Sequence, residues 1–351
     1  MMPSAGLTAR TASSANRCMF GRRQFLKAGV LLPAGLAFTA AARAGPSELA
    51  ALPELRFIVS SVPGGAVDLV ARVLALAFTQ TYKVPTIVIN VEGAAGEIAL
   101  KRLVTDAPDG RTWLLAQEAI ITINPSYYPR ASADILDGIV PVAQVATSNV
   151  YMLVRADDSI NSFKDLLSEA RSPTVPLPYG SGGVGSLHHL SMEDLSARLG
   201  LNLLHVPYKS NAPAAQALVR GEIRVLMAGT STLPLIQAGR LKMIAVTSPK
   251  RMAAYPDVPA LSEFVPGFQP TNWFGFFARK GVPEAMLNEM RGLLQSSIES
   301  EEIRRAVSDR SDAQMAFASG RAFMDLILGD RQRYMDIVQR LKSSKTPATA
   351  K

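Results

Sequence analysis

The chain has 351 residues, of which 48% are hydrophobic and 19% are charged, a balance that excludes both a charge-rich disordered chain and a protein that is apolar throughout. At this length a single hydrophobic core stops growing, so we expect about two compact lobes. The formal net charge of +8 comes mostly from residues 1–44, which hold six basic residues and no acid. The rest has 31 basic and 29 acidic residues, so the sequence predicts no nucleic-acid partner.

Residues 1–44 are predicted to be a cleaved export signal. A basic start precedes the apolar run Ala28–Ala42, which is too short to span a bilayer, and the small-residue site Ala42-Arg43-Ala44 follows. The segment Gly21-Arg22-Arg23-Gln24-Phe25-Leu26-Lys27 resembles the twin-arginine export motif, although Gly21 stands where Ser or Thr is usual. An ordinary secretory signal stays open as the alternative. Both routes predict cleavage near Gly45 and a periplasmic protein, and Cys18, the sole cysteine, would be removed with the signal.

Beyond Gly45, β-rich runs alternate with segments of helical periodicity, a pattern typical of an α/β fold with largely parallel sheets. In chain order the expected elements are the strand Leu55–Ser60, the helix Ala66–Gln80, the strand Thr86–Asn90, the helix Gly96–Thr105, the strands Trp113–Gln117 and Val150–Val154, the helix Ser162–Ala170, the strand Thr174–Pro178, the helix Ser186–Leu199, the strand Leu203–Val206, the helix Ala212–Arg220, the strands Arg224–Met227, Met243–Val246 and Trp273–Ala278, and the helices Glu284–Ser297 and Arg321–Leu341.

Two segments interrupt this alternation. Pro141–Val154 is almost unbroken apolar sequence, and Pro256–Trp273 is rich in Pro and Gly. We expect the chain to cross between lobes at both places. Lobe 1 then comprises residues 45–147 and 268–342, and lobe 2 comprises residues 148–267. A central ligand cleft is expected between the two lobes. Residues 343–351 are expected to form a flexible tail.

A glycine-rich turn, Ser60-Ser61-Val62-Pro63-Gly64-Gly65, joins the first expected strand to the first helix. The N-terminus of a helix presents unpaired N–H groups and a partial positive charge, so such a turn can hold a carboxylate or phosphate. A tight turn without any ligand is the alternative interpretation.

A second turn, Tyr179-Gly180-Ser181-Gly182-Gly183-Val184-Gly185-Ser186, satisfies the G-x-G-x-x-G pattern between a strand and a helix. A dinucleotide fold places an acid after the next strand to hold the ribose, but the strand Leu203–Val206 is followed by Pro207-Tyr208. We therefore interpret this segment as a second anion-binding turn, with the hydroxyls of Ser181 and Ser186 as further donors.

Enzyme chemistry has little support in the sequence. The mature chain has three histidines, His188, His189 and His205, and neither a G-x-S-x-G nor an H-E-x-x-H motif. A histidine pair without a partner carboxylate at motif spacing is more typical of packing than of catalysis. The sequence predicts no catalytic residues, no metal site and no cofactor, and a periplasmic hydrolase or lyase is kept as the weaker alternative.

Several segments together resemble one family. Pro63-Gly64-Gly65-Ala66-Val67-Asp68-Leu69-Val70-Ala71-Arg72 resembles the P-G-G-x-x-D-x-x-A-R signature of the Bug-type solute receptors, the extracytoplasmic binding subunits of tripartite tricarboxylate transporters. Further blocks follow in the family's order: Asn90-Val91-Glu92-Gly93-Ala94-Ala95-Gly96, Pro108-Asp109-Gly110-Arg111-Thr112, Asn124-Pro125-Ser126-Tyr127-Tyr128, Gly185-Ser186-Leu187-His188-His189-Leu190, His205-Val206-Pro207-Tyr208-Lys209, Ala245-Val246-Thr247-Ser248 and Asn272-Trp273-Phe274-Gly275. The resemblance extends from about Leu55 to about Leu341.

The resemblance implies a bilobal periplasmic-binding-protein fold of type II-like architecture, which closes on a small carboxylated solute. It also implies the membrane subunits of a transporter as partners. A receptor without its own transporter, which signals to a membrane sensor kinase, stays open as the alternative, and we expect the protein to be a monomer. Carried over by position, the ligand-binding residues are Ser60, Ser61, Gly64, Gly65 and Asp68 in lobe 1, and Gly180, Ser181, Gly182, Gly183 and Ser186 in lobe 2. The chain departs from the family pattern at Ser61-Val62, at Ala95 and at Ser210.

Overall fold

Two β-sheets organise the part of the chain that the structure describes. The computed structural model describes residues 47–127, 136–270, 272–311 and 313–344, all within one compact unit. The predicted export signal and residues 345–351 of the predicted tail lie outside these ranges.

Sheet 1 has the strand order β11-β4-β10-β3-β1-β2, and sheet 2 has the order β7-β6-β8-β5-β9. The strands of sheet 1 are β1 (Leu55–Val59), β2 (Thr86–Asn90), β3 (Thr112–Gln117), β4 (Ile139–Ser148), β10 (Asn272–Arg279) and β11 (Gln314–Ser319). Those of sheet 2 are β5 (Tyr151–Arg155), β6 (Leu177–Ser181), β7 (Leu203–Pro207), β8 (Val225–Ala228) and β9 (Leu241–Val246). Three strands in each sheet run parallel, and the others pair antiparallel.

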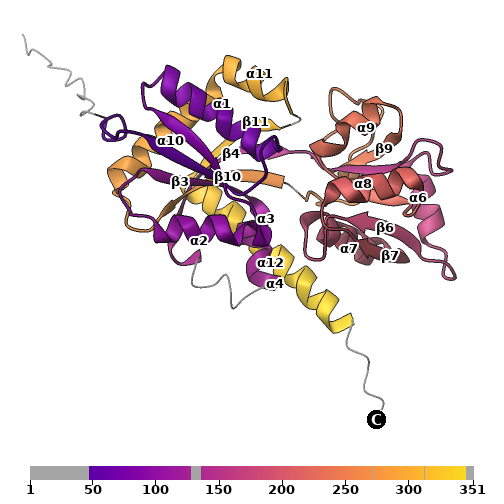
Figure 1. The fold of residues 1–351 in the computed structure, drawn as a ribbon. Coiled ribbons are helices and arrows are strands. Elements are labelled where there is room, and N and C mark those ends of the chain that lie inside the picture. Colours follow the sequence, from indigo (N-terminus) through magenta and orange to yellow (C-terminus); the bar gives the residue numbers. More distant parts are fainter. Residues whose placement is uncertain (1–46, 128–135, 271, 312, 345–351) are drawn as a thin grey trace, which may run out of the picture. The chain divides into compact units, whose positions relative to one another are not determined.

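Helices cover both faces of sheet 1 (Figure 1). One face packs against α1 (Ala66–Gln80), α10 (Glu284–Glu299) and α11 (Glu301–Ser308), and the other against α2 (Glu97–Thr105), α3 (Glu118–Thr122) and α12 (Gly320–Ser344). In α1 the side chains of Val67, Val70, Leu74 and Phe78 recur at helical spacing and are fully buried. This apolar stripe is what holds the helix on the sheet.

Sheet 2 is covered in the same way. The helices α6 (Phe163–Ala170) and α7 (Leu187–Leu199) pack on one face, and α8 (Asn211–Arg220) and α9 (Leu233–Gln237) pack on the other. The described residues also include the short helix α4 (Asn124–Tyr127) and the 3-10 turns Ala94–Gly96, Thr230–Thr232 and Leu261–Glu263. No described helix has the length and apolar character needed to cross a membrane.

The apolar segment that was expected to be a crossing is mostly a strand. Residues Ile139–Ser148 form β4, which lies between β11 and β10 in sheet 1, and the chain enters sheet 2 only at Tyr151. Because helices cover both faces of this strand, its apolar run is continuous rather than alternating. Pro141 is accommodated beside a register shift between Phe276 and Phe277 of β10.

The last helix belongs to both cores. Phe323 and Ile327 of α12 pack under sheet 1, whereas Tyr334, Ile337 and Val338 pack into the core beneath sheet 2. The helix also extends to Ser344, three residues beyond its expected end at Leu341. Residues of the two sheets are therefore linked through one continuous helix in addition to the connecting strands.

Candidate functional site

A cavity of about 460 Å³ opens where strands of both sheets end. The lining segments follow β1, β2 and β3 in sheet 1 and β6 and β7 in sheet 2, and Asn272 adds the start of β10. The lining residues are Ser60, Ser61, Val62, Glu92, Gly93, Ala95, Gly96, Gln117, Glu118, Ala119, Ile120, Asn124, Gly182, Val184, Gly185, Ser186, Leu187, His188, Lys209, Ser210, Asn211 and Asn272. The carboxyl ends of parallel strands are where α/β sheets usually bind ligands, so this is the candidate site.

The first predicted turn contributes its serines rather than its glycines to the cavity wall. Ser60 and Ser61 line the cavity, and the buried hydroxyl of Ser60 has no hydrogen-bond partner. Gly64 and Gly65 are not among the lining residues and shape the turn. Gly64 has a φ of 83°, in the left-handed region where glycine is favoured, and Gly65 is the residue before the first turn of α1.

Asp68 ties this turn to the rest of sheet 1. Its carboxylate is buried and accepts hydrogen bonds from the Gly64 N–H at 2.8 Å, from Asn90 Nδ2 at 2.8 Å and from Arg72 Nε at 2.9 Å. Burial pushes the pKa of Asp68 upward, but the hydrogen bonds from Arg72, Gly64 and Asn90 together outweigh it, so this pKa lies below its usual value. Asp68 itself does not line the cavity. Through these hydrogen bonds Asp68 holds the turn that carries Ser60 and Ser61 in place.

The second predicted turn begins inside a strand. Gly180 and Ser181 are the last residues of β6, where the Leu177–Ser181 strand pairs with β7 and β8, three residues later than the expected strand. A side chain at Gly180 would place its Cβ 2.4 Å from Ile223 Cδ1. A larger residue at this position would therefore require the Ile223 side chain to move.

The hydroxyl of Ser181 is occupied by neighbouring protein groups. It lies 2.7 Å from His205 Nε2 and accepts a hydrogen bond from the Gly183 N–H at 3.2 Å, and Ser181 is fully buried. Gly182 and Ser186 line the cavity, whereas Gly180, Ser181 and Gly183 do not. Ser186 also caps α7, because its hydroxyl accepts from the His189 N–H at 3.2 Å.

Two residues that the sequence did not single out as ligand contacts complete this side of the cavity. Asn211 Nδ2 lies 3.3 Å from His188 Nδ1, while Asn211 Oδ1 and His188 Nε2 are buried without a hydrogen-bond partner. Burial lowers the pKa of His188 to about 4, so the ring is neutral at pH 7. With Nδ1 accepting from Asn211, the proton is on Nε2, a buried donor without a protein partner.

Glu118 lies at the opposite wall, directly after β3. The residue is 1% exposed, and its Oε2 has no hydrogen-bond partner. Burial, reinforced by the nearby Asp330 carboxylate, raises the pKa of Glu118 well above its usual value. A buried glutamate beside a ligand-sized cavity had no signal in the sequence, because only the fold brings α12 against α3.

The predicted site residues thus divide into two groups. Ser60, Ser61, Gly182 and Ser186 line one cavity although they come from different sheets. The other six, which are Gly64, Gly65, Asp68, Gly180, Ser181 and Gly183, lie outside the lining and hold the two turns. Among the described residues no group of three or more His, Cys, Asp or Glu side chains is placed to hold a metal ion.

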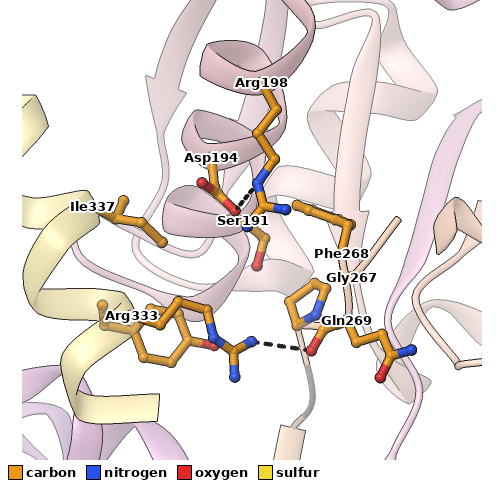
Figure 2. A pocket seen from close by; sticks show the side chains of 10 residues that line it. Ser191, Asp194, Arg198, Gly267, Phe268, Gln269, Arg333 and Ile337 are labelled. Carbon is orange, nitrogen blue, oxygen red and sulfur yellow. Dashed lines mark hydrogen bonds and ion pairs between the residues drawn. The ribbon is translucent and has the colours of Figure 1, made fainter. Parts of the chain in front are cut away.

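A second, much smaller cavity lies between α7, α12 and the segment Gly267–Pro270 (Figure 2). Its volume of about 10 Å³ is close to the space that a single water molecule needs. Asp194 pairs with Arg198 and Arg340, and Arg333 donates to the backbone oxygen of Gln269. These contacts join α12 to elements of sheet 2 and leave no room for an organic solute.

The family is decided by comparison with known proteins. The model of the family described as "Tripartite tricarboxylate transporter family receptor" matches residues 70–342. The chain belongs to this family. The resemblance to Bug-type receptors predicted from the sequence is confirmed, and the members of this family are solute-binding receptors rather than enzymes.

Alignments with two relatives cover most of this receptor's chain. A UPF0065 protein of a Pseudomonas species is 31% identical over 324 residues, which cover 91% of this chain and 94% of the relative. BugT of Bordetella pertussis is 26% identical over 291 residues, covering 81% of this chain and 88% of BugT.

Solved structures of similar proteins have the same fold. The periplasmic binding protein BugD is 26% identical with a TM-score of 0.69, covering 82% of this chain and 97% of BugD. An R. palustris protein with adipate is 25% identical with a TM-score of 0.73, covering 82% and 96% of the two chains. MatC from Rhodopseudomonas palustris with bound malate is 25% identical with a TM-score of 0.67, covering 82% and 100%. The receptor therefore has the predicted α/β periplasmic-binding-protein fold, with two sheets and their covering helices.

Proposed function

We propose that this receptor captures a small carboxylated solute in the 460 Å³ cavity and delivers it to the membrane subunits of a tripartite tricarboxylate-type transporter. One observation carries the proposal. Four buried polar atoms without a hydrogen-bond partner, Ser60 Oγ, Glu118 Oε2, His188 Nε2 and Asn211 Oδ1, all belong to residues that line this cavity. Unpartnered buried polar atoms cost stability, and a polar solute that bonds to them removes this cost.

The proposed carboxylate site uses neutral donors. Lys209 is the one Lys or Arg among the described lining residues, and it is exposed. The first N–H groups of α7, at Leu187 and His188, lack partners within the helix and lie beside Ser186 on the cavity wall. Together with the Ser60 hydroxyl and the His188 Nε2 proton, they are the groups that would hold the anion.

We further propose that sheets 1 and 2 form the cores of two lobes, with residues 45–147 and 268–342 in the first and 148–267 in the second. The solute then touches Ser60 and Ser61 from one lobe and Gly182 and Ser186 from the other. Gly64, Gly65, Asp68, Gly180, Ser181 and Gly183 shape the two turns. The solute acts as a bridge that favours closure of the lobes.

The export signal is part of the same proposal. Residues 1–44 direct the chain to the periplasm, the twin-arginine pathway is favoured by Arg22-Arg23, and cleavage near Gly45 leaves a mature monomer. A sensor kinase is the alternative partner. Deleting the membrane subunits of a tripartite tricarboxylate-type transporter in the host cell would abolish uptake of the solute in the first case and leave it unchanged in the second.

Equilibrium binding to the purified full-length chain tests the function. Malate, adipate, monocarboxylates and their amides are screened by thermal shift, and each hit is titrated by calorimetry. Saturable binding without turnover supports a receptor, and a free solute concentration of 100 times Kd should stabilise the fold by about 2.7 kcal/mol. Conversion of a bound acid into a new product would instead support a periplasmic hydrolase or lyase.

A further inference from the structure

Glu118 differs from the other deeply buried carboxylates described above. Asp68, Asp194 and Asp330 each accept hydrogen bonds from Arg side chains, and Asp330 also accepts from Trp273 Nε1 at 2.8 Å. Glu118 is equally buried, yet its Oε2 is unpartnered and the residue lines the ligand cavity. A polar atom left in this position points to a partner that arrives with the solute.

The groups around Glu118 favour its uncharged form. Asp330 and Tyr334 of α12 are the anionic and phenolic groups near it, and Arg333 is already engaged with Asp330. From the other lining segments, the titratable groups are His188, which is neutral, and the exposed Glu92 and Lys209. No described cation pairs with Glu118, and burial together with Asp330 raises its pKa well above the usual glutamate value, which favours the protonated form.

We propose that Glu118 is a specificity-determining residue of the cavity, which as an uncharged carboxylic acid donates a hydrogen bond to an uncharged acceptor on the solute, such as an amide or ketone oxygen. The terminal torsion of a glutamate side chain is broad, so a turn of the carboxyl group brings its O–H to the cavity surface. The proton stays on Glu118, and no bond of the solute changes.

The same charge balance excludes a second carboxylate at this wall. An ion placed beside Glu118 would be removed from water without a buried cation to compensate it, and such a transfer is costly. An amide or hydroxyl needs no counter-charge at this wall. The preferred solute class is therefore an acid with one carboxylate and an uncharged polar end, an inference that depends on the proposed carboxylate receptor.

Probes that differ at one end test this preference. Hexanoate, adipate, adipamate (the mono-amide of adipate) and 6-aminohexanoate share a six-carbon chain with a carboxylate at one end and differ at the other end. The corresponding four-carbon compounds provide a second length. Calorimetric titration of the full chain should give a higher affinity for the amide acid than for the apolar, dicarboxylate or ammonium member of its series. One hydrogen bond to Glu118 corresponds to about a tenfold difference in Kd. A dicarboxylate or ammonium acid that binds more tightly than the amide acid would overturn the inference while leaving the receptor function intact.

Variants assign the preference to Glu118. Glu118→Gln keeps an uncharged donor and should retain the affinity for the amide acid within about threefold, whereas Glu118→Ala should lose about tenfold. Glu302→Gln removes an exposed acid from α11, outside the cavity lining, and should change neither value. If Glu118→Gln weakens binding as much as Glu118→Ala does, Glu118 acts as an anion and the proposal is wrong.

Infrared spectroscopy tests the protonation of Glu118 without any solute. At pH 7 the full chain should show the carbonyl band of a protonated carboxylic acid, and Glu118→Gln should lose part of it while Glu302→Gln does not. A band that is identical in the parent and in Glu118→Gln would refute the uncharged state. If none of the acids binds and this band is present, the receptor proposal fails and the protonation of Glu118 stands.

Discussion

Replacement of Asp68 by Asn tests how the serine-bearing turn is held. Asp68 Oδ2 accepts from both the Gly64 N–H and Arg72 Nε, and Oδ1 accepts from Asn90 Nδ2. An asparagine retains one acceptor oxygen, so its amide nitrogen would face the donor group of Asn90. Asn90 cannot simply turn over, because Nδ2 also donates to the Ser61 backbone oxygen and Oδ1 accepts from Arg72.

The loss works out to a few kcal/mol. A hydrogen bond to a charged group contributes about 1.5–3 kcal/mol, and one such bond is replaced by an unfavourable donor pair, so Asp68→Asn should destabilise the fold by about 2–4 kcal/mol. Arg72 is 51% exposed at its side chain, which makes Arg72→Gln a matched control with an expected cost below about 1 kcal/mol.

Urea unfolding of the full chain at pH 7, followed by far-UV circular dichroism and by tryptophan fluorescence, measures both costs. Because the pKa of Asp68 is lowered in the fold, its stabilisation is present at neutral pH and is lost as the pH falls below about 4. The difference between the parent and Asp68→Asn should therefore shrink in acid. Equal costs for Asp68→Asn and Arg72→Gln, or a pH-independent difference, would refute the assigned role of Asp68.

Three further predictions concern stability, export and closure. Because the pKa of Glu118 is raised in the fold, the stability of the parent should fall as the pH rises above the ordinary glutamate pKa. The melting temperature of Glu118→Gln should therefore exceed that of the parent by an amount that grows between pH 5 and pH 8, and a constant difference would contradict this. Changing Arg22 and Arg23 together to Lys keeps the charge but should leave unprocessed precursor in the cytoplasm, whereas normal periplasmic levels would indicate the ordinary secretory route. A saturating solute should lower the radius of gyration measured by small-angle scattering, and an unchanged curve would argue against closure of the two lobes.

The elements with clear periodicity were predicted well from the sequence. The helix Ala66–Gln80 and the strand Thr86–Asn90 have their expected bounds, because each carries a regular apolar pattern and ends at turn residues. The strands β4 and β11 were missed. Pro141 and the continuous apolar run hid β4 from a reading of the pattern, and β11 carries no apolar–polar alternation that identifies it.

The two glycine-rich turns could be predicted from the sequence, but not which of their residues line the cavity and which only shape the turn. Whether Ser60 or Gly64 faces the cavity depends on the direction of a few side chains after β1, and Ser181 is taken out of reach by His205 from the neighbouring strand. Glu118 is placed by the packing of α3 against α12, more than 200 residues along the chain. Contacts of this kind follow from tertiary structure and leave no local signal.

The central claim is that the cavity between the two glycine-rich turns binds a carboxylated solute. Ser60→Ala tests it most directly, because Ser60 Oγ has no protein partner and its removal breaks no hydrogen bond of the fold. Calorimetric titration with an acid identified by the screen should show affinity reduced by about 1.5–3 kcal/mol in Ser60→Ala, and unchanged in Ser308→Ala, which removes a hydroxyl from α11 away from the cavity. Equal affinity of the parent and Ser60→Ala for that acid would contradict the account.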